Sequence, residues 1–226
     1  GLPGSFQASD GVYPDKVGLS WETPFVIETA AESSLFGPPL GSHASLAIDS
    51  TGTLHAVYLS RWLHGDADLM HAWTTPGGCW ETEIVEADLS HFRIDSQTSL
   101  AIDDNDILHI AYVDSTSNGI MHAWKPVFTW LTEIVATEAT YNPAGVSIGT
   151  DSNDVVHVAW QGHEGLRYAM KTSGTWQVEA VAATTPQAGD AAMVVKADGT
   201  IHIAYQTGAG LDHAWKTASG SWNFQA

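Results

Sequence analysis

The stretch 45–85 contains four short segments, Ser45-Leu-Ala-Ile-Asp49, Leu54-His-Ala-Val-Tyr58, Leu69-Met-His-Ala-Trp73 and Trp80-Glu-Thr-Glu-Ile-Val85. They are rich in Val, Ile, Tyr and Trp and are bounded by Gly, Asn, Asp or Ser, which is typical of β-strands separated by turns. The same order returns three times: Ser99–Asp103, Leu108–Tyr112, Ile120–Trp124 and Trp130–Val135; Ser147–Asp151, Val156–Trp160, Leu166–Met170 and Trp176–Val181; and Ala192, Ile201–Tyr205, Leu211–Trp215 and Trp222. The chain is therefore built from a four-strand unit that occurs four times.

The turn between the first and second segments is the strongest local signal in each copy. It contains Thr51-Gly52, Asn105-Asp106, Asn153-Asp154 and Asp198-Gly199. These residue types tolerate the positive φ of a two-residue hairpin turn. Each copy thus begins with an antiparallel hairpin, and the pattern leaves no place for a helix.

The repeat predicts an all-β fold, a β-propeller of four four-stranded antiparallel blades. The tryptophans that open the fourth segments, Trp80, Trp130, Trp176 and Trp222, lie 50, 46 and 46 positions apart. A four-stranded sheet of this length cannot cover both of its apolar faces, and neighbouring blades cover them in propellers. We expect blades at 43–86, 97–136, 145–182 and 191–226, with the first strand of each blade innermost and the fourth outermost.

One fourth-type strand is surplus, because Trp21-Glu-Thr-Pro-Phe-Val-Ile27 resembles the segments that begin at the four later tryptophans. We expect residues 21–29 to form an extra N-terminal outer strand that closes the ring, within a propeller of residues 21–226. Residues 1–20 are then an N-terminal extension or a module junction. The alternatives are a fragment of a larger ring, or a subunit that forms a homo-oligomer by lending this strand to a partner.

Composition excludes several classes of function. Eight Lys and Arg against 26 Asp and Glu give a formal net charge of -18, which repels nucleic acid and anionic membrane surfaces. Apolar runs fall short of the roughly 20 residues that a membrane-spanning helix needs, so we expect no membrane insertion. The single cysteine, Cys79, cannot form an internal disulfide. No motif for a cofactor is present, and we expect none.

The repeat resembles those of bacterial extracellular propellers, which include carbohydrate-binding lectins and the sialidase-like and polysaccharide-lyase propellers. The resemblance covers residues 43–226 and implies a fold rather than an activity. Sialidase-like propellers carry an Asp-box, which Asp49-Ser-Thr-Gly52 matches only loosely, and their chemistry needs several inward arginines. This chain has only Arg61, Arg93 and Arg167, so sialidase chemistry is not carried over.

A second resemblance lies in Ala8-Ser-Asp-Gly-Val-Tyr-Pro-Asp-Lys-Val17, followed by Leu19 and Trp21, which is similar to the opening of bacterial fibronectin-type modules. It implies a modular protein. Together the two resemblances imply a secreted or cell-surface location.

Two sets of recurring polar residues favour a structural role over metal binding. One set is His55, His109, His157 and His202 on the second strand, with His71, His122 and His213 on the third. Residues that recur in every blade are spread around a ring rather than gathered at one point, so we expect buried imidazoles that bond to backbone or hydroxyl groups. The other set, Asp49, Asp103 and Asp151, lacks the ligand ladder of a calcium loop and suits turns.

Binding residues are expected where the repeat is broken. The loops 60–68 and 86–97 of the first blade are distinctive, and they leave the same edge of a propeller blade. They contain the candidate ligand site: Arg61, Trp62, His64, His91 and Arg93. Two guanidinium groups beside a Trp suit a carboxylated or sulfated sugar. Surface ion pairs with Asp66, Asp68 or Asp95 are the alternative.

The sequence therefore predicts a binding or scaffold propeller with a glycan-type ligand, and the two arginines of the loop site favour an anionic sugar. Aromatic residues such as Tyr58, Trp73 and Trp124 could also stack on sugar rings between blades. No nucleophile elbow, phosphate loop or metalloprotease motif is present, which favours binding over catalysis. A polysaccharide lyase or glycosidase, and a structural or oligomerising fragment without a small ligand, remain as alternatives.

Overall fold

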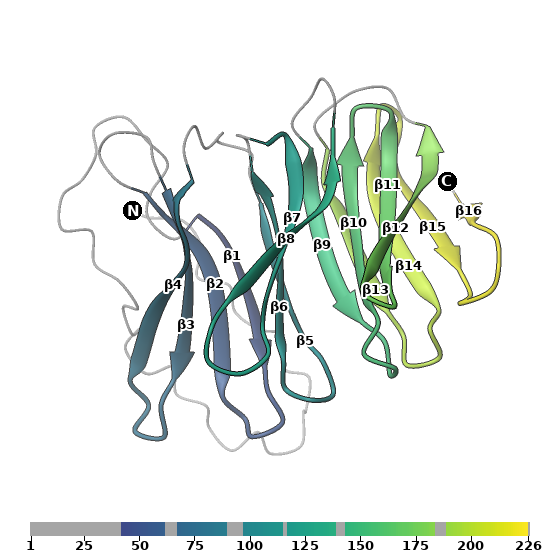
Figure 1. Ribbon diagram of the computed structural model, residues 1–226. Coiled ribbons are helices and arrows are strands. Elements are labelled where there is room, and N and C mark those ends of the chain that lie inside the picture. The colour runs from purple at the N-terminus through teal and green to yellow at the C-terminus, as the bar shows by residue number, and fades with distance from the viewer. Residues whose placement is uncertain are drawn as a thin grey trace, which may run out of the picture.

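The computed structural model describes residues 42–61, 67–89, 97–114, 117–138, 143–183 and 189–225. In this part of the chain every regular element is a β-strand, and the sixteen strands form four separate antiparallel sheets (Figure 1). No helix among these residues is long and apolar enough to cross a membrane. The prediction of an all-β fold with four four-stranded antiparallel sheets is confirmed.

Each sheet is one blade, in which the strands follow in sequence order. Blade 1 contains β1 (Ser42–Ile48), β2 (Leu54–Arg61), β3 (Ala67–Thr74) and β4 (Trp80–Leu89). Blade 2 contains β5 (Thr98–Ile102), β6 (Leu108–Asp114), β7 (Gly119–Lys125) and β8 (Leu131–Thr137). Blade 3 contains β9 (Ala144–Thr150), β10 (Val156–Gly162), β11 (Gly165–Thr172) and β12 (Thr175–Ala183). Blade 4 contains β13 (Ala191–Val195), β14 (Ile201–Thr207), β15 (Gly210–Lys216) and β16 (Asn223–Gln225).

The apolar faces of successive blades pack against each other. One face of blade 1, including Val57 and Leu69, packs on Leu100 and Ile110 of blade 2. Equivalent clusters join blade 2 to blade 3 and blade 3 to blade 4. The first strands of successive blades are in contact, β1 with β5, β5 with β9 and β9 with β13. Each Val, Leu or Ile side chain that is fully buried at these junctions stabilises the fold by about 1.5–3 kcal/mol.

A serine of the first strand adds a polar link at each junction. The hydroxyl oxygens of Ser45, Ser99 and Ser147 accept hydrogen bonds from backbone N–H groups of the next blade, at 3.0, 3.2 and 3.0 Å. The donors are Leu100, Ile148 and Met193. This contact explains why Ser begins the repeated Ser-Leu-Ala-Ile-Asp segment in the first two blades.

The turns after the first strands carry positive φ at the expected residues, with values of 88°, 59°, 58° and 74° at Gly52, Asp106, Asp154 and Gly199. Their length differs from the prediction. Gly52 N–H donates to the carbonyl of Asp49, and Asp49 N–H donates to that of Thr53. Three residues, 50–52, therefore connect the strands, and the left-handed residue is the last of them, as in a type I turn with a G1 bulge.

The predicted closure of the ring is wrong for this structure, in which the four sheets form an open series from blade 1 to blade 4 (Figure 1). Leu46 on the outward face of blade 1 is 67% exposed. Leu100, Ile148 and Met193 hold the same repeat position and are only 7%, 6% and 8% exposed, because the preceding blade covers them. The predicted closing strand 21–29 and extension 1–20 lie outside the described residues.

Candidate functional site

The loop site predicted from sequence lies almost wholly outside the described residues. Trp62, His64, His91 and Arg93 are not described, and Arg61 is described only as the last backbone position of β2. The register of blade 1 pairs Arg61 with Ala67 and Ala67 with Leu89. The strand ends from which both loops leave thus share one edge of the blade, and convergence of the five side chains stays a prediction.

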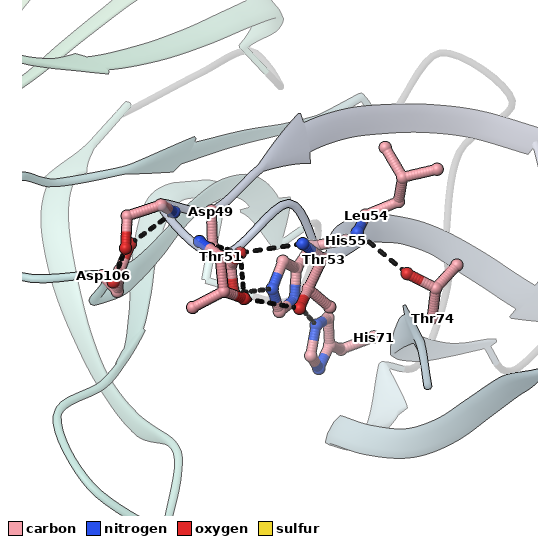
Figure 2. Close-up of polar contacts among 9 residues, drawn as sticks. Asp49, Thr51, Thr53, Leu54, His55, His71, Thr74 and Asp106 are labelled. Atoms are coloured by element: carbon pink, nitrogen blue, oxygen red, sulfur yellow. Dashed lines mark hydrogen bonds and ion pairs between the residues drawn. The ribbon is translucent and has the colours of Figure 1, made fainter. Parts of the chain in front are cut away.

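A chain of polar contacts crosses blade 1 near the opposite edge, where the β1–β2 and β3–β4 turns lie. Asp49 Oδ1 accepts hydrogen bonds from the backbone N–H groups of Thr51 and Thr53, at 2.9 and 2.8 Å. Asp49 Oδ2 lies 3.3 Å from Nε2 of His55 (Figure 2). His55 Nδ1 lies 2.9 Å from His71 Nε2, and His71 Nδ1 lies 2.9 Å from Glu83 Oε1. Asp49 directly follows β1, and His55, His71 and Glu83 lie on β2, β3 and β4.

The same chain is repeated in blade 2 and altered in the next two blades. Asp103, His109, His122 and Glu133 are joined by distances of 3.3, 3.0 and 2.9 Å. In blade 3, Tyr168 replaces the second imidazole, and its hydroxyl group is hydrogen-bonded to His157 Nδ1 at 2.6 Å. In blade 4, the stacked pair of His202 and His213 is kept at 3.1 Å.

These contacts correct the partners predicted for the histidines. Imidazoles and carboxylates, rather than backbone groups, bond to His55 and His109, whereas His157 bonds to a hydroxyl group as predicted. Asp49, Asp103 and Asp151 each accept two backbone N–H groups of their own turn, so the turn-forming role is confirmed. In the described part of the chain no three His, Cys, Asp or Glu side chains gather into a possible metal site.

In blades 1 and 2, the series of polar contacts from aspartate to glutamate contains three hydrogen bonds, which need three protons. Two neutral imidazoles supply only two. In the tautomers that satisfy Glu83, His55 Nδ1–H donates to His71, and His71 Nδ1–H donates to the carboxylate. The third contact, between Asp49 Oδ2 and His55 Nε2, is the longest, at 3.3 Å. Burial lowers the pKa of His71 and that of His122 to about 4, although each imidazole faces a glutamate.

In blades 1 to 3, the glutamate of the fourth strand also bonds to the next blade. Glu83 accepts hydrogen bonds from Lys125 Nζ, at 2.5 and 2.8 Å, and from Trp130 Nε1 at 3.0 Å. Glu133 accepts from Lys171 at 2.6 Å and from Trp176 at 2.9 Å. Glu179 accepts from Lys216 and, at 3.2 Å, from Trp222. Every junction between described blades therefore carries one carboxylate, one ammonium group and one indole N–H in the same arrangement.

Aromatic rings flank each of these ion pairs. Lys125 Nζ lies 5.8 Å from the ring centroid of Trp73 and 5.6 Å from that of Trp130. Lys171 lies over Trp124 at 4.3 Å and Trp176 at 5.9 Å, and Lys216 lies over Tyr168 at 4.6 Å and Trp222 at 5.0 Å. The rings stabilise the ammonium groups by cation–π attraction. All of these tryptophans are partly exposed to solvent.

The charge state of the carboxylates follows from their partners. Burial opposes ionisation of Glu83, but hydrogen bonds from Lys125, His71 and Trp130 outweigh it and hold its pKa below the ordinary value. The pKa of Glu133 is lowered in the same way by Lys171, His122 and Trp176, against the effect of burial. Both side chains are about a quarter exposed and remain ionised acceptors at neutral pH.

Sequence reasoning singled out the aromatic residues of the junctions but not their charged residues. Trp73 and Trp124 do lie at junctions, whereas Trp215 belongs to the outward face of blade 4. The available signal was the Trp-x-x-Glu motif in three copies, together with a lysine directly after the third strand segment in copies two to four. Pairing them required knowledge that the glutamate of one copy meets the lysine of the next.

Comparison of the structure with known proteins shows the fold. The chain resembles an Aleuria aurantia lectin, described as a six-bladed β-propeller with a novel fucose recognition mode, at 18% identity with a TM-score of 0.63. It also resembles the SapL1 lectin in complex with α-methyl fucoside, at 19% identity and 0.60, and the Hadza microbial sialidase Hz136, at 12% and 0.58.

The alignments cover 84%, 82% and 81% of this chain, respectively, but 63%, 63% and 46% of those proteins. The chain thus spans less than two thirds of their length. No family model matches the sequence, and no curated relative matches it. The likeness establishes a β-propeller fold of the kind found in lectins and a sialidase.

Proposed function

We propose that this chain is a glycan-binding protein whose binding sites are the junctions between its blades. One observation carries the proposal: each junction holds a partly exposed carboxylate, fixed by a lysine and an indole N–H of the next blade and flanked by aromatic rings. Sugars need this combination, because hydroxyl groups donate to a carboxylate while the apolar face of the ring stacks on an aromatic side chain.

Spare acceptor capacity at the glutamates supports a binding role. Lys171, Trp176 and His122 all donate to Oε1 of Glu133, and Lys216 and Trp222 both donate to Oε1 of Glu179. In the described structure no protein group donates to Oε2 of Glu133 or of Glu179, so these two atoms are suited to sugar hydroxyls. Fucose-binding lectins among the structural neighbours make fucosides a reasonable first set of probes.

The lowered pKa of Glu83 and of Glu133 argues for binding rather than glycoside hydrolysis at these positions. Glycosidases protonate the leaving group with a carboxylic acid whose pKa is raised. A carboxylate that is held ionised by lysine cannot serve as this acid. It remains a good hydrogen-bond acceptor.

A glycan array that includes fucosides tests the proposal, followed by titration of the strongest ligand. The triple variant Glu83→Gln/Glu133→Gln/Glu179→Gln should lose binding at least tenfold, because a neutral amide is a weaker acceptor and adds an N–H group. Glu164→Gln is the matched control, since Glu164 is highly exposed in the β10–β11 turn at the other edge of blade 3. Binding that the triple variant retains in full would place the site elsewhere.

A further inference from the structure

The three junctions differ in how completely the protein itself occupies the glutamate. Glu83 and Glu133 each receive an imidazole, an ammonium group and an indole N–H. In the described structure, Glu179 receives only Lys216 and Trp222. The missing donor is explained by Tyr168, which holds the position of His71 and His122 but directs its hydroxyl group to His157.

Exposure follows the number of donors. The side chain of Glu179 is 43% exposed, against 27% for Glu83 and 26% for Glu133. A sugar hydroxyl can therefore reach Glu179 without displacing a protein donor. Its hydrogen bond to the carboxylate offsets the free energy that is lost when water leaves the carboxylate on binding. At Glu83 the Oε2 atom already accepts from Lys125 at 2.8 Å, and at Glu133 the side chain is less exposed than at Glu179.

The third junction has a different aromatic wall, because Met170 stands where Trp73 and Trp124 stand in the first two, and Phe224 is added from blade 4. Phe224 is paired with Ala214, whose side chain lies in the core between blades 3 and 4, so Phe224 belongs to the same face of blade 4. Residues two apart in a strand project to the same side, which places Phe224 beside Trp222. Phe224 is 53% exposed. The equivalent residues, from the pairing with Ala123 and Ala169, are Thr132 and Val178.

We infer that the junction between blades 3 and 4 is the principal saccharide site of this chain. Its ligand is a sugar with two neighbouring hydroxyl groups for Glu179 and a methyl group or apolar ring face for Trp222 and Phe224. Lys216, which is buried between the rings of Tyr168 and Trp222, fixes the carboxylate. The inference rests on the proposed glycan binding and ranks the sites within it.

Single variants, titrated with methyl α-L-fucoside by calorimetry and by amide chemical shifts, test the ranking. Glu179→Gln should raise the dissociation constant at least tenfold, and Phe224→Thr should raise it about three- to tenfold. Glu164→Gln, at the other edge of blade 3, is the control and should change it less than twofold, while Glu83→Gln should raise it less than Glu179→Gln does. Thermal unfolding of each variant shows whether the fold is kept.

Tyr168→His separates ligand contact from structural support. It recreates the imidazole of the first two junctions, which the same fold accommodates there, and supplies Glu179 with a third donor. The affinity for the fucoside should fall while the unfolding temperature stays within a few degrees. This readout distinguishes occupation of the carboxylate from damage to the blade.

The outcomes distinguish the two proposals. If neither the fucoside nor any glycan of an array binds, the proposed function fails and the ranking fails with it. If a glycan binds, and Glu83→Gln or Glu133→Gln abolishes that binding while Glu179→Gln does not, glycan binding at the junctions stands and the ranking is overturned.

Discussion

Leu46 and Leu100 offer a direct test of the open arrangement of blades, because the two leucines hold the same repeat position in blades 1 and 2. Leu100 is 7% exposed under the preceding blade, and Leu46 is 67% exposed. Truncation of a buried Leu to Ala costs about 2–5 kcal/mol, from lost burial and from the cavity that remains. We expect the free energy of unfolding to fall by about 3 kcal/mol in Leu100→Ala.

The corresponding loss for Leu46→Ala should be below about 1 kcal/mol. Only about a third of this side chain is buried, and full burial of a Leu contributes about 1.5–3 kcal/mol. No cavity term applies at an exposed position. The two variants remove the same atoms from the same local sequence, Ser-Leu-Ala-Ile-Asp, so strand propensity cancels in the comparison.

Urea unfolding, followed by tryptophan fluorescence, measures the difference. The slope with denaturant must be the same for both variants and the parent, because repeat proteins can unfold in stages and a changed slope would invalidate the comparison. A loss at Leu46 as large as that at Leu100 would refute the reasoning. It would show that the outward face of blade 1 is covered in solution.

Three further predictions follow from the polar chains and the loops. Burial lowers the pKa of His71 and that of His122 to about 4, below the value of about 6.5 in an unfolded chain. The unfolded state therefore binds protons more readily, so the free energy of unfolding should fall as the pH drops from about 6.5 to 4, and a flat profile in urea titrations would contradict this. Asp103→Ala should destabilise blade 2 by about 1–3 kcal/mol, because two backbone N–H groups lose their acceptor, whereas the fully exposed Asp198 should respond much less to the same change in thermal unfolding. Arg61→Ala/Arg93→Ala should weaken binding of a sulfated or uronate sugar, and its salt dependence, with little change in unfolding temperature; unchanged binding isotherms would remove the loop site.

The sequence was sufficient for features that arise within one copy of the repeat. Gly52, Asp106, Asp154 and Gly199 identified the turns because a positive φ is a local requirement that few residue types meet. The order of strands followed from the short connections. These features need no knowledge of how one blade lies against another.

Contacts between different copies of the repeat could not be predicted from the sequence in this way. Glu83 and Lys125 are 42 residues apart, and their meeting depends on which face each strand turns toward the neighbouring blade. The functional prediction therefore turned to the irregular loops of blade 1, while the partly exposed carboxylates lie at regular positions of the repeat. Ring closure failed for a related reason, since a strand count does not give the angle between blades.

Blades 1 and 4 are the ends of the series, and each has one outward face that no neighbouring described blade covers. These two faces lack the residues that hold the junctions together. Blade 4 has Ala192 where Ser45, Ser99 and Ser147 accept backbone N–H groups, and Gln225 where the three glutamates accept lysine and tryptophan. Blade 1 has Thr74 where blades 2 to 4 have lysine, and Thr74 instead accepts the N–H group of Leu54 at 2.9 Å. Val194 stands where Ala47, Ala101 and Gly149 allow close approach, and a Cβ atom on Gly149 would lie only 3.0 Å from Val195. Blades 4 and 1 therefore lack the serine, glutamate and lysine that hold the other junctions, and Val194 is larger than its equivalents, which makes a fourth junction of the same kind between these two blades unfavourable.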